Sequence, residues 1–124
     1  MTGQLRLTNG RRLRSPHGQL VRPTTWRVRE ALMNILREKI KDSNWLDLYS
    51  GSGIISCEVM EKGARHLLSV EFNRKVYEIC RLNIESINQQ IDTQIFVNTI
   101  NTEAIKLLKS GYKKYSTKTY QKLG

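Results

Sequence analysis

WLDLYSGSG, at residues 45–53, is an apolar run that breaks into two glycines separated by one residue. A second apolar run, HLLSVE at residues 66–71, ends in an acid about 20 residues after the first run. A strand that turns through Gly-x-Gly into a helix is typical of nucleotide-binding α/β folds, and the later acid is placed to accept hydrogen bonds from ribose hydroxyls. We therefore expect Gly51, Gly53 and Glu71 to line one ligand site.

Two features of this stretch argue against a dinucleotide. Asp47 puts a carboxylate just before the glycines, where it would repel a pyrophosphate and attract a ligand that carries a sulfonium and an amino group. The third glycine of the dinucleotide fingerprint is replaced by Ser56. The pattern favours an S-adenosylmethionine site that includes Asp47 and Tyr49. An NAD-type dinucleotide-binding half-domain is the alternative.

The composition bounds the class of protein. A chain of 124 residues with 39% hydrophobic and 26% charged residues has the size and balance of one small globular domain. No apolar run approaches the roughly 20 residues that span a bilayer, and the first ten residues do not look like a secretory signal. Cys57 and Cys80 fall on the apolar side of helical patterns, so we expect both to be buried free thiols that bind no metal, in a reducing compartment. Together these features predict a cytoplasmic protein with no membrane partner.

The net charge of +10 is unevenly distributed. Residues 1–29 contain seven arginines and no acid, all 11 acids lie between residues 30 and 103, and the six basic residues after position 104 are lysines. Basic ends around a near-neutral middle attract a phosphate backbone, and arginine binds phosphate with two parallel hydrogen bonds. We expect the N-terminal arginines to bind RNA and the lysine tail to be a solvated surface. The RNA-binding candidates are Arg11, Arg12, Arg14 and Arg27.

Periodicity predicts an α/β fold. Residues 5–14 indicate a hairpin around Asn9-Gly10, and a helix capped by Thr24 or Thr25 follows. Strands are expected at 45–49, 66–71 and 94–97, with helices at 54–62, from Asn73 onward, and at 103–109. Strands that alternate with helices at this spacing are parallel, which predicts the order 3-2-1. The predicted apolar stripe of the first helix is Val28, Ala31, Leu32, Ile35 and Leu36.

We divide the chain into three parts. Residues 1–23 form a basic N-terminal extension, and residues 24–109 form a partial Rossmann-like domain. Residues 110–124 form a lysine-rich tail that we expect to be disordered, because it has almost nothing to bury.

The sequence resembles the bacterial RsmD-type methyltransferases, which modify guanine N2 of 16S ribosomal RNA. RPTT at 22–25, RVRE at 27–30, LDLYSGSG at 46–53 and VEFN at 70–73 carry the resemblance, which runs from about Leu5 to about Leu108. It implies a Rossmann-like sheet, S-adenosylmethionine as cofactor and ribosomal RNA as partner. It also implies that Arg22 and Thr24 close over the cofactor and that Asn101 flanks the adenine, a place for which Glu103 competes.

The chain departs from this family in one respect. The family carries an Asp/Asn-Pro-Pro-Tyr/Phe motif after its fourth strand, whereas the only two prolines here are Pro16 and Pro23. The motif holds the target amine, so no catalytic residue is assigned. The resemblance implies the first, cofactor-binding half of the fold, and we expect this chain alone to be inactive. A non-enzymatic RNA-binding remnant is the second alternative.

Overall fold

The computed structural model describes residues 5–16 and 26–111. Two of the site candidates, Arg22 and Thr24, lie outside these residues. The predicted cap of the first helix (Thr24 or Thr25) and nearly all of the tail at 110–124 lie outside them as well. The elements of the described parts are β1 (Leu5–Arg6), β2 (Arg12–Leu13), α1 (Trp26–Ile40), β3 (Asn44–Asp47), α2 (Ile54–Glu61), β4 (His66–Val70), α3 (Arg74–Gln90), β5 (Phe96–Ile100) and α4 (Ala104–Ser110).

The three longer strands form one parallel sheet in the order β3-β4-β5. Leu46 of β3 lies beside Leu68 of β4, which lies beside Asn98 of β5. The predicted strand order 3-2-1 and the α/β class are confirmed. Because each strand is followed by a helix, all carboxyl ends of the strands lie at one edge of the sheet.

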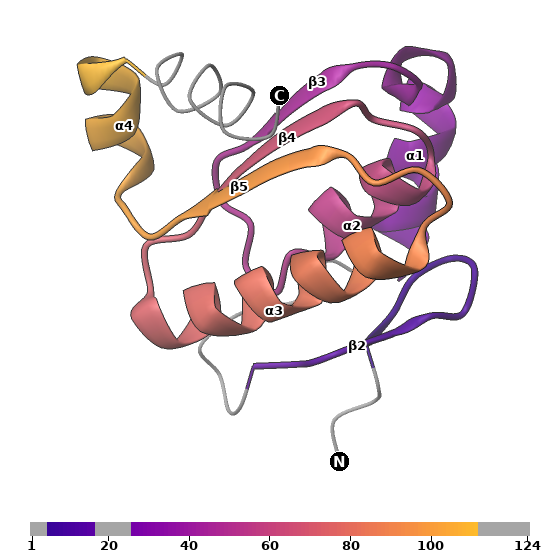
Figure 1. The fold of residues 1–124 in the computed structure, drawn as a ribbon, viewed down its shortest axis with the longest axis horizontal. Helices are drawn as coiled ribbons and strands as arrows, with labels where there is room; N and C mark the ends of the chain where they lie inside the picture. The colour runs from indigo at the N-terminus through magenta and orange to yellow at the C-terminus, as the bar shows by residue number, and fades with distance from the viewer. Residues whose placement is uncertain (1–4, 17–25, 112–124) are drawn as a thin grey trace.

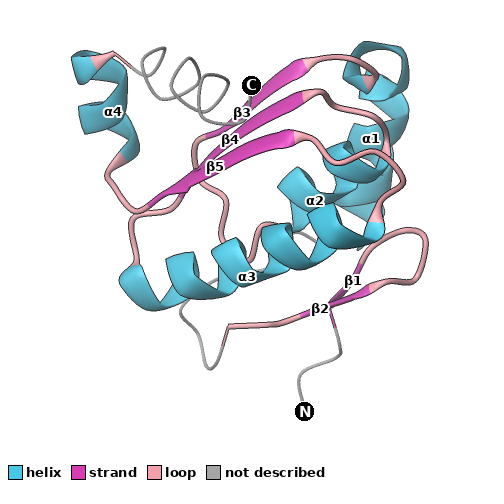
Figure 2. Ribbon diagram, in the orientation of Figure 1, coloured by secondary structure: helices cyan, strands magenta, loops and turns pink. Residues whose placement is uncertain are grey.

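The elements are arranged in layers. Helices α1, α2 and α3 cover one face of the sheet, and the β1–β2 hairpin lies against the outer side of these helices (Figure 1 and Figure 2). Leu7 and Leu13 of the hairpin are buried in the same hydrophobic cluster as α1, α2 and α3. On the other face, α4 packs Leu107 against Leu68 and Val70. The predicted hairpin is therefore present and is part of the core.

The inward face of helix α1 matches the predicted stripe only in part: Leu32 and Leu36 pack against the core as predicted, and the other stripe residues are exposed. Its buried residues are Arg29, Met33 and Ile40, whereas Ile35 of the predicted stripe is 78% exposed and Val28 is 58% exposed. The reason is electrostatic. Arg29 lies beside the fully buried carboxylate of Glu58 on α2, and a buried charge needs an opposite charge close by. A pattern read from apolar residues alone hides such an arginine.

Several strand boundaries also differ from the prediction; β5, for example, ends at Ile100 rather than at 97. Strand β5 begins at Phe96 rather than at 94, because the side chain of Asn88 on α3 binds the backbone of Ile95. Asn88 Oδ1 accepts from Ile95 N–H at 2.9 Å, and its Nδ2 donates to Ile95 O at 3.2 Å. Strand β3 ends at Asp47, so Tyr49 lies in the turn that follows. The cap at Asn73 is confirmed, with its side chain accepting from Val76 N–H.

The inward face of α1 can be tested with two substitutions that lie two residues apart, on nearly opposite faces of the helix. Met33→Ala should lower the free energy of unfolding by about 2–4 kcal/mol, because it empties a packed site in the core. Ile35→Ala should change it by no more than about 0.5 kcal/mol, because that side chain is exposed. Urea denaturation of the two variants measures the difference. Equal losses would mean that the predicted stripe, and not the observed one, faces the core.

Candidate functional site

The candidate site lies where the carboxyl ends of β3 and β4 meet. Residues 50–53, which we call the glycine loop, follow β3 and lead into α2. Glu71 follows β4, and Asn101 follows β5. Three of the segments singled out from the sequence therefore come together at one edge of the sheet, as the parallel topology requires.

The glycine loop has a backbone shape that only glycine adopts without strain. Gly51 and Gly53 have φ angles of 55° and 87°. A Cβ atom on Gly53 would lie 3.0 Å from Cys80 Sγ on α3, which is too close. Gly53 N–H donates to Ser50 O at 2.7 Å and closes the turn. The loop thus lies directly against α3 at Gly53.

Glu71 is oriented by the backbone around it. Its Oε1 accepts from Gly51 N–H, and its Oε2 accepts from Asn73 N–H, both at 2.9 Å. A carboxylate has about four lone-pair sites, so two acceptor positions are left for hydroxyl groups of a ligand. The carboxylate is therefore fixed in place at the mouth of the glycine loop.

Asp47 lies behind the loop in a partly buried polar cluster. Ser56 Oγ donates to Asp47 Oδ2 at 2.7 Å, so the serine that replaces the third fingerprint glycine holds this carboxylate. Burial raises the pKa of Asp47 and the nearby negative charge of Glu71 adds to this, while hydrogen bonds from Ser56 and Ser50 oppose the rise. A cation bound near Asp47 would relieve the cost of burying the negative charge.

The two cysteines behave as expected from the sequence. Cys57 and Cys80 are free and buried. Burial raises the pKa of the Cys80 thiol to about 12, so it is neutral near pH 7.

In residues 5–16 and 26–111, no three His, Cys, Asp or Glu side chains gather where they could hold a metal ion. None of the helices described is both long and apolar enough to cross a bilayer.

Asn101 joins the end of β5 to the end of β4. Its Nδ2 donates to Glu71 O at 2.9 Å and to Phe72 O at 2.8 Å. Glu103, the competing candidate, is exposed at the start of α4.

Two aromatic side chains stand exposed at the same edge of the sheet: Tyr49 is 76% exposed and Phe72 is 69% exposed. The sequence pattern pointed to Tyr49 and missed Phe72, although its place directly after Glu71 was a usable signal.

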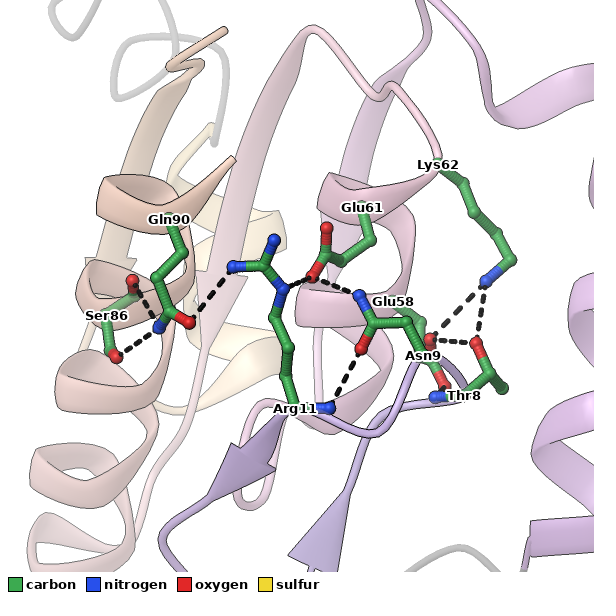
Figure 3. Close-up of polar contacts among 8 residues, drawn as sticks. All are labelled: Thr8, Asn9, Arg11, Glu58, Glu61, Lys62, Ser86 and Gln90. Atoms are coloured by element: carbon green, nitrogen blue, oxygen red, sulfur yellow. Dashed lines mark hydrogen bonds and ion pairs between the residues drawn. The ribbon is translucent and has the colours of Figure 1, made fainter. Parts of the chain in front are cut away.

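The N-terminal arginines have unequal surroundings. Arg12 and Arg14 on the hairpin and Arg27 on α1 are exposed. Arg11, in contrast, contacts two neighbouring side chains. Its Nε lies 2.8 Å from Glu61 Oε2, and one guanidinium nitrogen donates to Gln90 Oε1 at 3.0 Å (Figure 3).

A second polar cluster fastens the hairpin to α2. Glu58 accepts hydrogen bonds from both the backbone N–H and the hydroxyl of Thr8, each at 3.0 Å, and Lys62 Nζ lies 3.4 Å away (Figure 3). Arg29 Nε lies 3.3 Å from the other side of the same carboxylate, and burial lowers the pKa of this guanidinium. That Glu58 joins three elements could not be predicted from local spacing, because its partners Thr8 and Arg29 are distant in the sequence.

A cavity of about 610 Å³ lies at the opposite edge of the sheet, near the amino ends of the strands. Its lining contains three basic and three acidic residues, namely Arg11, Lys41, Arg65, Asp42, Glu61 and Asp92. This balance gives no preference for a charged ligand, and the glycine loop is not part of the lining. The oriented carboxylates and the glycine loop make the carboxyl edge the better candidate.

A family model described as "Conserved hypothetical protein 95" matches residues 2–117. The chain belongs to this family.

Two curated relatives are both named "Ribosomal RNA small subunit methyltransferase D". The protein of Escherichia coli K12 is 38% identical over 79 residues, which are 60% of this chain and 40% of that protein. The protein of Buchnera aphidicola from Acyrthosiphon pisum is 30% identical over 92 residues, which are 74% and 48%. This chain spans about half the length of these relatives. A solved structure named "Putative methyltransferase yhhF from Escherichia coli" superposes with a TM-score of 0.71 at 28% identity, over 86% of this chain and 56% of that chain.

These similarities confirm the resemblance to the RsmD-type ribosomal RNA methyltransferases, together with the Rossmann-like fold. They do not favour the dinucleotide-binding or the RNA-remnant alternative.

The tight fit of the glycine loop gives a prediction with an internal control. Gly53→Ala should lower the free energy of unfolding by about 2–4 kcal/mol, because it adds a contact with Cys80 to the strain of a positive φ. Gly10→Ala carries the same strain at φ 91° with no atom within 4 Å of the new Cβ, so it should cost only about 1–2 kcal/mol. Thermal melts compare the two. A Gly10 variant as unstable as the Gly53 variant would show that α3 does not press on the loop.

Proposed function

We propose that this chain is the cofactor-binding half of an S-adenosylmethionine-dependent methyltransferase that modifies guanine N2 of 16S ribosomal RNA in the cytoplasm. The observation that carries the proposal is the Glu71 carboxylate, held by Gly51 N–H and Asn73 N–H beside the glycine loop. Membership of a family whose curated relatives are named as ribosomal RNA methyltransferases supports it.

The residues present fit the cofactor. Glu71 would accept hydrogen bonds from the ribose hydroxyls with its remaining lone pairs. Gly51 and Gly53 would let the backbone approach the methionine part closely. Asp47, whose charged form is disfavoured by burial, would gain from the cofactor's positive charge.

The walls of the site come from neighbouring segments. Phe72 and Tyr49 offer exposed aromatic faces for the adenine or for an incoming base. Asn101 donates to the backbone carbonyls of both Glu71 and Phe72 and so holds the backbone that carries these two side chains. Arg22 and Thr24, which lie outside the described residues, would close over the cofactor as the family resemblance implies.

Methyl transfer needs more than this half supplies. S-adenosylmethionine provides the methyl group on its sulfonium, and the enzyme must hold the target amine in line with that group. In the family this is done by the Asp/Asn-Pro-Pro-Tyr/Phe motif, which the 124 residues do not contain. We therefore assign no catalytic residue, and we propose that these residues alone bind the cofactor without transferring the methyl group.

The RNA would lie along the hairpin and α1. Arg12, Arg14 and Arg27 are exposed and can pair with phosphates, whereas Arg11 must share its guanidinium with Glu61. The hairpin is fastened to α2 through Glu58, so bound RNA would meet a surface that is fixed relative to the glycine loop.

The cofactor proposal predicts that the chain binds S-adenosylmethionine and not NADH in isothermal titration calorimetry. Glu71→Gln should weaken binding by at least about tenfold, because hydrogen bonds to a charged acceptor contribute about 1.5–3 kcal/mol. Asp92→Asn removes one negative charge from the exposed loop at the opposite edge of the sheet and serves as the matched control, with unchanged affinity. Binding of NADH alone would overturn the proposal, and so would an equal loss in the two variants.

The RNA proposal predicts how affinity for 16S ribosomal RNA depends on salt. The logarithm of the affinity should fall linearly with the logarithm of salt concentration, and Arg12→Ala and Arg14→Ala should each reduce the slope by about 0.7–0.9. Arg11→Ala should reduce it less, because Glu61 already balances its charge. Filter binding between low and moderate salt gives the slopes. If the Arg12 and Arg14 variants keep the wild-type slope, the hairpin is not part of the RNA interface.

A further inference from the structure

Asn83 is a buried polar residue on the otherwise apolar face of α3. It is 3% exposed, between Cys80 and Ile84 in the packed core. A carboxamide at such a position costs free energy unless its donors and acceptor are all used. In Asn83 they are.

The partners of Asn83 come from two distant segments of the chain. Its Oδ1 accepts from Arg14 N–H at 2.8 Å, and its Nδ2 donates to Arg14 O at 2.9 Å. The same Nδ2 donates to Ser52 O at 2.8 Å. Ser52 lies between the two glycines of the glycine loop, and Arg14 is the exposed arginine that follows β2. One side-chain amide thus touches both the loop and the hairpin.

Helix α3 also contacts the glycine loop one turn before Asn83. Cys80, three residues before Asn83, is the residue against which Gly53 packs. Glu58 fastens the other end of the hairpin, at Thr8, and its polar contacts within the described residues do not include the glycine loop. Among the described contacts of the hairpin, Asn83 is therefore the one that reaches the glycine loop.

We propose that Asn83 is a positioning residue that fixes the glycine loop relative to the hairpin, so that a ligand at the loop and an RNA on the hairpin influence each other's binding. The coupling rests on the proposed function, whereas the positioning does not. A ligand that orders the loop also orders Asn83, and the amide passes this restriction to the Arg14 backbone. Such coupling is reciprocal: each ligand changes the affinity of the other by the same factor.

Three variants separate positioning from simple stability. Asn83→Leu keeps a similar volume and removes all three hydrogen bonds. Asn83→Asp keeps the acceptor for Arg14 N–H and loses the donors to Ser52 O and Arg14 O. Gln90→Leu is the matched control, because it removes an amide on α3 that holds the hairpin through Arg11 and does not reach the loop.

The first experiment measures amide hydrogen exchange in the ligand-free chain, relative to Leu68 in the sheet. Asn83→Leu should speed exchange at both Gly53 and Arg14 by about fivefold to tenfold, the range expected for one lost hydrogen bond. Asn83→Asp should speed exchange at Gly53 and leave Arg14 N–H protected, and Gln90→Leu should leave Gly53 unchanged. If Asn83→Leu does not fold, Asn83→Asp against Gln90→Leu decides. Unchanged exchange at Gly53 in the Asn83 variants would overturn the positioning role.

The second experiment measures the affinity for 16S ribosomal RNA with and without saturating S-adenosylmethionine. The ratio of the two affinities should differ from one in the wild type and in Gln90→Leu, and should return to one in Asn83→Asp. A residue with only a structural role would weaken both affinities and leave the ratio unchanged, which would overturn the coupling. If the wild type does not bind the cofactor, the proposed function and the coupling both fail, and hydrogen exchange still decides the positioning role.

Discussion

The backbone of the glycine loop is satisfied from inside the protein, and the site at the carboxyl edge of the sheet depends on this. Gly51 N–H is bound by Glu71, Gly53 N–H by Ser50 O, and Ser52 O by Asn83. A buried loop with unpaired amides would be costly and would shift to find partners. Because its partners are already present, the loop keeps its shape before any ligand arrives, and a ligand has only to restrict the motion that remains.

A buried carboxylate on the other side of the molecule sets how the outer elements pack. Glu58 has no contact with water, so it needs positive charge and hydrogen-bond donors around it. Thr8 supplies two donors, Lys62 supplies a charge, and Arg29 supplies a second charge from α1. The same requirement thus places the hairpin on α2 and turns Arg29 toward the core beside Leu32 and Leu36, while Val28 and Ile35 of the predicted stripe stay exposed.

Features that depend on neighbouring residues could be predicted from the sequence, and features that depend on distant partners could not. The turn at Gly51 and Gly53, the strand order and the cap at Asn73 follow from local spacing. The phase of α1 could not be predicted, because Arg29 is buried by a partner 29 positions away, and the start of β5 depends on Asn88. The contacts of Asn83 could not be predicted either, because its partners lie 31 and 69 positions away.

The proposed binding of S-adenosylmethionine at the carboxyl edge of the sheet can be tested by a backbone NMR titration of the ¹⁵N-labelled chain. Added S-adenosylmethionine should shift the amide signals of Gly51, Gly53 and Asn73 together, with one common affinity, because the first and last of these amides bind the Glu71 carboxylate. Saturable shifts confined to the cavity around Arg65 and Phe96, at the amino ends of the strands, would contradict the account.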